Sequence, residues 1–153
     1  MSVERAAEYL AQFGLGDAIL VMDGSTATVD LAAQALGVEP ARIAKTLAFQ
    51  QKEGPAVIVM CGTARVDNKK YKAAFGCKAK MLSFEETLEV TGHPVGGVCP
   101  FGLPEGVKVY LDQSLRQFET VYPAAGSPHS CIKLTIPQLE QTSHGSWVDV
   151  AQD

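Results

Sequence analysis

The chain has 153 residues, of which 46% are hydrophobic and 20% are charged, and its formal net charge is −4 at pH 7. This length fits one domain, residues 1–153, and the composition is that of an ordinary globular protein and not of a disordered one. The negative charge excludes a protein that coats nucleic acid non-specifically, because that mode of binding requires many phosphates to be neutralised.

Several features of the sequence lead us to expect a cytoplasmic protein. The longest apolar runs, 18–22 and 56–61, are far shorter than the roughly 20 residues that a membrane-spanning helix requires. The first residues contain no apolar signal region. The four cysteines are spread between Cys61 and Cys131 and match neither a zinc-ligand spacing nor a dense disulfide framework. We therefore expect reduced thiols, no metal, no cofactor and no membrane contact.

The predicted elements alternate between helices and strands. In chain order they are a helix over 3–13, a strand over 18–22, a helix over 28–36 between Thr28 and Gly37, a helical turn over 40–43, a strand through Lys45, a strand over 56–62, a helix over 67–75 followed by a further strand, a helix over 83–92, and strands over 107–111, 120–123 and 131–136. The predicted helices are inferred from the spacing of apolar residues and from capping residues at their ends. Hairpins after Lys45 and near Gly126 argue against a purely parallel sheet. We expect a mixed α/β fold with a partly closed sheet surrounded by helices.

The strand around Lys45 carries a charge where its pattern is apolar. In an extended chain Lys45 shares one face with Ile43, Leu47 and Phe49. Burying an ammonium costs free energy unless it is partnered, so the position predicts a negatively charged ligand. The alternative is a lysine at the start of a strand whose ammonium reaches water.

A basic segment interrupts this acidic chain. Residues 65–80 contain six basic residues and only one acid, Asp67. The basic residues are Arg65, Lys69, Lys70, Lys72, Lys78 and Lys80. Most of them fall on the helix that Asp67 is expected to cap and on the strand after it. Such a patch could grip a few phosphates, and a solvated helix face is the alternative.

Two loops could form the walls of a binding site. The first, 92–102, is rich in glycine, so its backbone N–H groups could converge on a carbonyl or an oxyanion. It matches neither a Walker loop nor a dinucleotide fingerprint, and a tight structural turn is the alternative. The second loop, 124–130, lies between two predicted strands and offers two hydroxyls and His129. A surface histidine is the alternative interpretation of His129.

Conventional nucleophile schemes find little support in the sequence. A thiolate pair of Cys99 with His93 or His129 has no local signature, and a buried inert thiol is the alternative. The chain contains no G-x-S-x-G elbow and no H-E-x-x-H motif. The residues therefore offer no catalytic triad and no metal site.

Taken together and in this order, these stretches resemble the YbaK/ProX-like aminoacyl-tRNA deacylases, free-standing relatives of the editing domain of prolyl-tRNA synthetases. The matching segments are 31–38, 43–47, Gly62 with 65–67 and 69–70, Gly92 with 96–102, and 125–126. Each motif is weak by itself, but their order and spacing are specific and span nearly the whole chain.

The resemblance implies a YbaK/ProRS-associated editing domain over residues 1–153. Such a domain hydrolyses the ester that joins a mischarged small amino acid to the terminal adenosine of tRNA. The resemblance assigns Lys45 to positioning the 3′ end and the backbone of Gly96 and Gly97 to holding the aminoacyl carbonyl, while a ribose hydroxyl of the substrate activates water. The further candidates are Thr46, Gly126 and His129 for substrate, and Arg65, Lys69 and Lys70 for tRNA phosphates.

Two departures from the family leave the amino acid open. Several members carry a serine where this chain has Ala124, and some carry an aspartate near the position of Cys131. One methylene is worth only about 1 to 3 kcal/mol in a small pocket, so alanine, cysteine, serine and threonine are all candidates. The expected partners are tRNA and an aminoacyl-tRNA synthetase. The rival function is a non-catalytic module of the same fold that binds tRNA, a synthetase or a small aminoacyl ligand, and a cysteine hydrolase using Cys99 is a third.

Overall fold

The computed structural model describes residues 2–153, and its centre is a mixed six-stranded sheet. The strands are hydrogen-bonded in the order β7-β5-β2-β3-β4-β8. Their bounds are β2 (Ile43–Gln51), β3 (Gly54–Cys61), β4 (Lys108–Asp112), β5 (Thr120–Pro123), β7 (Leu134–Thr135) and β8 (Ser146–Val148). The pairs β2–β3 and β5–β7 are antiparallel, and β2–β5, β3–β4 and β4–β8 are parallel. The predicted mixed α/β fold, with a mixed and partly closed sheet, is confirmed.

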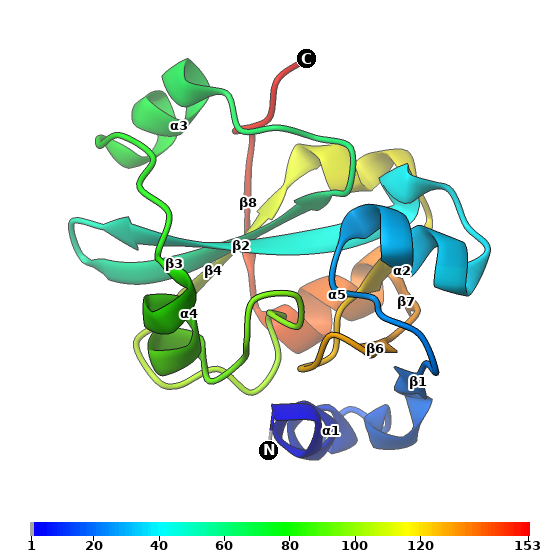
Figure 1. The fold of residues 1–153 in the computed structure, drawn as a ribbon. Helices are drawn as coiled ribbons and strands as arrows, with labels where there is room; N and C mark the ends of the chain where they lie inside the picture. The colour runs from blue at the N-terminus through cyan, green and yellow to red at the C-terminus, as the bar shows by residue number, and fades with distance from the viewer. Residues whose placement is uncertain (1) are drawn as a thin grey trace.

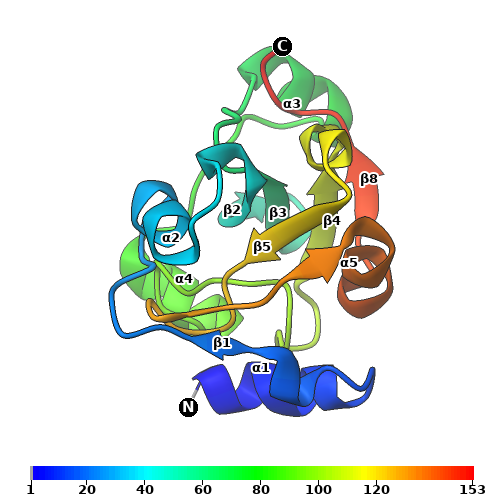
Figure 2. The same ribbon diagram turned by 90° about the vertical axis from the view of Figure 1, so that its right-hand side faces the viewer.

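Five α-helices surround this sheet in the described part of the chain. They are α1 (Ser2–Ala11), α2 (Val29–Leu36), α3 (Asn68–Phe75), α4 (Phe84–Thr91) and α5 (Ile136–Ser143). Figure 1 shows the long β2–β3 hairpin crossing the molecule between α3 and α4. Figure 2 shows α2 and α5 on opposite sides of β5, with α1 at the end of the molecule far from α3. In residues 2–153 no helix has the length and apolar character needed to cross a membrane.

The capping residues act as the sequence predicts. Thr28 Oγ1 accepts a hydrogen bond from the backbone N–H of Leu31 at 3.2 Å, and the side chain of Asp67 caps α3 in the same way. Ser83 and Glu86 form a reciprocal capping box at the start of α4. The predicted starts of these three helices are therefore confirmed, because each side chain satisfies a backbone N–H that has no partner within its helix.

The C-terminal third departs from the prediction. The strand expected over 131–136 is wrong, because the chain forms β6 (Ser130–Cys131), then β7, and then turns into α5 at Ile136. Thr135 and Gln138 form a second capping box at that point, and Pro137 lies in the first turn, so a helix start stands where apolar alternation suggested a strand.

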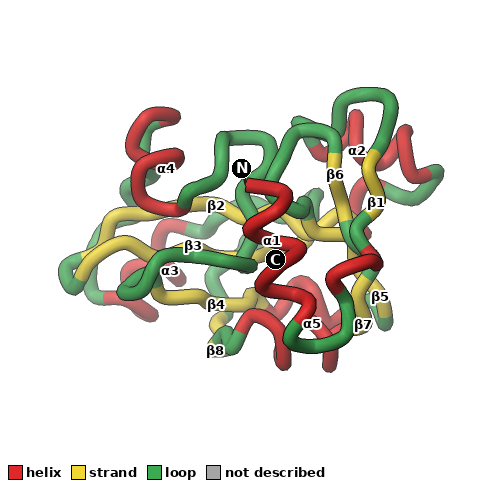
Figure 3. The backbone as a smooth tube through the Cα atoms, turned by 90° about the horizontal axis from the view of Figure 1, so that it is seen from below, coloured by secondary structure: helices red, strands yellow, loops and turns green. Residues whose placement is uncertain are grey.

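Two other strands are shorter than expected or missing. The strand expected over 18–22 is reduced to β1 (Leu20–Val21), which pairs with β6 outside the main sheet and lies beside it in Figure 3. The strand expected after α3 does not form, and that segment makes a single bridge, Met81 to Phe49.

Candidate functional site

The outer edge of β2 is open at its middle. Ile43 and Ala44 pair with β5, and further along Ala48 C=O accepts from Leu82 N–H at 3.0 Å while Gln50 N–H donates to the carbonyl of residue 80 at 2.9 Å. Backbone groups alternate between the two edges of an antiparallel strand. The N–H and C=O of Thr46 therefore face this edge as well, between the two covered stretches.

A cavity of about 290 Å³ lies along this open edge. Figure 3 shows α2 and α4 standing apart with the middle of β2 between them. The cavity walls come from the residues before and in α2 (Thr26, Ala27, Thr28, Val29, Ala32), from β2 (43–48), from the start of α4 (Met81, Leu82, Phe84, Thr87), from the glycine-rich loop (Val95, Gly96, Val98) and from Tyr122, Ala124 and Cys131. The three stretches that the sequence singled out thus meet around one hollow.

Lys45 lines this cavity and is half-buried. Its ammonium donates a hydrogen bond to the carbonyl oxygen of Ala64 at 2.5 Å. Burial lowers the pKa of Lys45 from its ordinary value, the neighbouring Cys61 opposes that shift, and the positive charge of Arg65 adds to it. The lysine therefore neither lies free in water nor pairs with a carboxylate of the described chain, so a ligand with negative charge would be a better partner than the carbonyl it has.

Thr46 lines the cavity and carries a hydroxyl that is shielded from solvent. This hydroxyl has no hydrogen-bond partner within the described protein. Because neighbouring side chains of a strand alternate, this hydroxyl lies on the opposite face of β2 from Lys45. A buried hydroxyl without a partner costs free energy, which a ligand hydrogen bond would recover.

The glycine-rich loop forms the wall facing β2. Pro94 to Gly97 make a tight turn in which Gly97 N–H donates to Pro94 C=O at 2.9 Å, and Gly96 has φ of 95°. A Cβ on Gly96 would lie 3.1 Å from the Cβ of Ala27. The loop therefore needs glycine at 96 both for its backbone conformation and for its closeness to the segment before α2.

Three predicted binding residues lie behind the cavity wall and do not line it. Gly97 N–H is used within the turn, and its carbonyl accepts from Gly126 N–H at 3.1 Å. His129 is exposed, and its Nδ1 donates to the carbonyl of Gly24 at 3.0 Å. Gly97 and Gly126 thus hold the two loops together, and His129 holds the turn that leads toward α2.

In the basic segment, Lys70 forms ion pairs within the protein, whereas other basic side chains are exposed to solvent. Lys70 binds Asp149 at 3.3 Å, Asp153 at 2.7 Å and the carbonyl of Ala151 at 2.9 Å, so it ties α3 to the C-terminal segment. Arg65 and Lys69 are exposed. The position of Lys70 is therefore less suited to a phosphate than those of its two neighbours.

Cys99 and His93 form a buried pair that lacks the properties of a nucleophile and its base. Cys99 Sγ lies 3.6 Å from His93 Nε2, but that nitrogen is 2.7 Å from the carbonyl of Phe101 and must carry its proton to donate there. Burial raises the pKa of Cys99 to about 12, and burial lowers the pKa of His93. A neutral thiol beside a neutral imidazole, both fully buried and outside the cavity lining, is an inert core contact.

Sequence reasoning missed two of the cavity walls. Thr26 and Ala27 before α2, and Met81 and Phe84 at the start of α4, line the cavity without belonging to any motif that indicates binding. The capping box at Ser83 located the helix start, but nothing in the sequence says that this start faces the middle of β2. That placement depends on the short backbone pairing between residues 80–82 and β2.

This fold is the one found in aminoacyl-tRNA editing domains. The family model for the aminoacyl-tRNA editing domain matches residues 23–142, so the chain belongs to that family and the resemblance inferred from sequence is confirmed.

Individual relatives agree with this membership. YwhH of Bacillus subtilis, a protein of uncharacterized function, is 46% identical over all of this chain and 99% of its own length. EbsC of Enterococcus faecalis, provisionally named a Cys-tRNA(Pro)/Cys-tRNA(Cys) deacylase, is 31% identical over 77% of this chain and 73% of its own. A crystal structure of a provisionally assigned trans-editing enzyme for prolyl tRNA synthetase superposes with a TM-score of 0.90 at 29% identity, covering 99% of this chain and 98% of that one.

Proposed function

We propose that this protein is a trans-acting aminoacyl-tRNA deacylase that hydrolyses the ester of tRNA mischarged with a small amino acid. The observation that carries the proposal is the meeting of Lys45, the open edge at Thr46 and the Gly96 turn around one small cavity. This site contains a half-buried cation, an unpartnered hydroxyl and an open backbone edge. These groups suit a ligand that carries a polar amino acid together with oxygens of a phosphate or an ester.

In this proposal the protein positions the ester and the substrate supplies the base. The Lys45 ammonium leaves the Ala64 carbonyl and holds the 3′ end of the tRNA, and the backbone at Gly96 receives the aminoacyl carbonyl. A ribose hydroxyl of the terminal adenosine activates the water that attacks this carbonyl. Positioning together with charge stabilisation accounts for such a reaction without a protein nucleophile.

The test is a deacylation assay on a panel of tRNAs charged with alanine, cysteine, serine and threonine. We expect the wild type to hydrolyse at least one of them, and we expect Cys99→Ala to retain that activity because the thiol is neutral and outside the cavity. If the protein binds tRNA but hydrolyses no aminoacyl-tRNA of the panel, the non-catalytic binding module becomes the better hypothesis. A selective loss of chemistry in a folded Cys99→Ala variant would favour the thiol hydrolase instead.

The exposed cations of the basic segment give a second prediction. Lys69→Glu is expected to weaken binding of tRNA and to lower the slope of log affinity against log salt by about one, because one phosphate contact is lost. Filter binding or fluorescence anisotropy between 50 and 200 mM salt would measure both quantities. Lys52→Glu, an equal change of charge at an exposed lysine outside the basic segment, is the matched control and should keep the slope of the wild type. Equal binding by the Lys69→Glu variant and the wild type would remove Lys69 from the interface.

A further inference from the structure

The rim of the cavity collects exposed apolar side chains. Among the described residues, the large hydrophobic side chains with the highest exposure include Met81 at 57%, Phe84 at 77% and Val95 at 43%, and all three line the cavity. The others of this kind, Leu20, Val21, Leu31 and Leu88, do not line it. Single exposed apolar residues need no explanation, but a group of them at the mouth of a binding site does.

Phe84 is the most exposed of these and is held firmly. It is the first residue of α4, directly after Ser83, and the capping box of Ser83 and Glu86 fixes the helix start with hydrogen bonds of 3.0 and 3.1 Å. The segment before it is fixed by the bond from Leu82 N–H to Ala48 C=O. An aromatic ring on a rigid support, with most of its surface in water, loses little conformational entropy when a flat ligand covers it.

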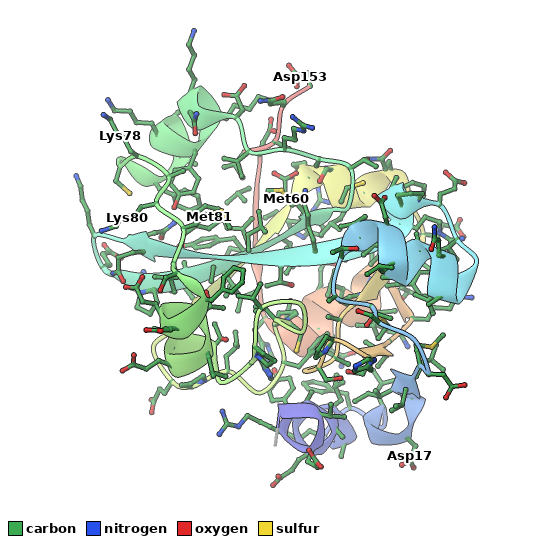
Figure 4. The ribbon with its side chains drawn as sticks, in the orientation of Figure 1. Asp17, Met60, Lys78, Lys80, Met81 and Asp153 are labelled. Carbon is green, nitrogen blue, oxygen red and sulfur yellow. The ribbon has the colours of Figure 1, made fainter. Side chains whose placement is uncertain are left out.

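Phe84 lies between a segment with positive charges and a helix with negative charges. Figure 4 shows Lys78, Lys80 and Met81 following one another along the segment between α3 and α4, with the lysine side chains at the edge of the molecule. On α4 itself, Glu85 and Glu89 are exposed. The lysines attract phosphates, whereas the carboxylates repel them, so the ligand part beside α4 should carry no charge.

We propose that Phe84 is a stacking platform for a nucleobase at the single-stranded 3′ end of the substrate RNA. Bases of single-stranded RNA stack on aromatic side chains, and their phosphates prefer nearby cations. The base covers Phe84, with Met81 and Val95 beside it, while the phosphates lie toward Lys78 and Lys80. This assignment rests on the proposed function for the identity of the ligand, and it adds a binding residue that acts before the ester reaches Lys45.

The test uses an RNA hairpin ending in single-stranded CCA, with 2-aminopurine in place of the terminal adenine. Stacking quenches the fluorescence of 2-aminopurine, so we expect quenching on binding to the wild type. Phe84→Ala should lose the quenching and weaken binding by about 5-fold to 150-fold, the range that alanine substitution gives for a base-stacking aromatic residue. Phe84→Trp should keep both. Leu88→Ala is the matched control, because this residue is exposed on the same helix and does not line the cavity.

The outcomes separate this inference from the proposed function. Absence of quenching in the bound wild type, or equal affinity of Phe84→Ala and Leu88→Ala for the hairpin, overturns the platform even if the wild type hydrolyses aminoacyl-tRNA. Quenching that depends on Phe84 supports the platform even if no ester is hydrolysed. Dimerisation of the wild type that is lost in Phe84→Ala, measured by analytical ultracentrifugation without RNA, would mean that a second copy covers this rim and would also overturn the platform.

Discussion

Lys45→Ala is expected to reduce deacylation by about 100-fold or more, which is the cost of removing a charge-stabilising donor from an active site. The physical reason is that Lys45 lines the cavity while its ammonium has only the neutral carbonyl of Ala64 as its present partner. Single-turnover hydrolysis of the aminoacyl-tRNA that the wild type prefers would measure this loss. Lys52→Ala, at an exposed lysine in the β2–β3 turn and outside the basic segment, is the matched control and should leave the rate unchanged.

Stability provides an independent readout for the same residue. Burial lowers the pKa of Lys45, which means that the fold disfavours the charged form. Between this lowered pKa and the ordinary value the unfolded chain binds more protons, so the contribution of Lys45 to stability rises with pH across that window. Lys45→Met keeps the apolar stem and removes the charge, so it should fold at least as stably as the wild type while losing activity. Wild-type hydrolysis by Lys45→Ala or Lys45→Met would remove Lys45 from the mechanism.

The sequence predicts the fold well where local signals and tertiary structure agree. The starts of α2, α3 and α4 are each marked by a capping side chain whose hydrogen bond is present in the structure. The β2–β3 hairpin follows from two apolar strands and the short connecting segment 51–55, of which Gly54 and Pro55 pair as the first residues of β3. These features are predictable because residues close together in the chain determine them.

Prediction failed where one local signal was outweighed by another and where distant contacts decide the structure. Residues 131–136 have an alternating pattern that suggested a strand, but the local capping box of Thr135 and Gln138 starts a helix there, and the distant pairing of Leu134 with Val121 leaves only a short strand before it. The free edge of β2 is also a product of tertiary structure, because it exists only where β5 ends and the segment at Lys80 has not yet begun. Lys45 was predictable as a site residue because it places a charge in the apolar pattern of a strand. No sequence pattern predicts that Phe84 lines the cavity.

The glycine-rich loop shows how the structure assigns different tasks to adjacent residues. Gly96 lines the cavity, while Gly97 lies against the second loop, where Ser127 packs directly on it. The resemblance to the editing family placed the backbone of both glycines in the binding role. Only the structure reveals that the Gly97 N–H already has the carbonyl of Pro94 as its partner.

Gly97→Ala is therefore expected to act through packing. An alanine Cβ at this position would lie 2.6 Å from the backbone N and Cα of Ser127, far inside ordinary contact, and neither backbone can move without shifting a cavity loop. Overpacking of this kind costs about 1 to 3 kcal/mol in the free energy of unfolding. Urea denaturation would measure it, and deacylation should fall in the same variant because Gly96 and Ala124 are carried on the two loops that are pushed apart. Gly24→Ala is the matched control, since a Cβ there meets nothing within 4 Å. Equal stability of both variants and the wild type would contradict the close packing of these two loops, and with it the conclusion that Gly97 acts through packing.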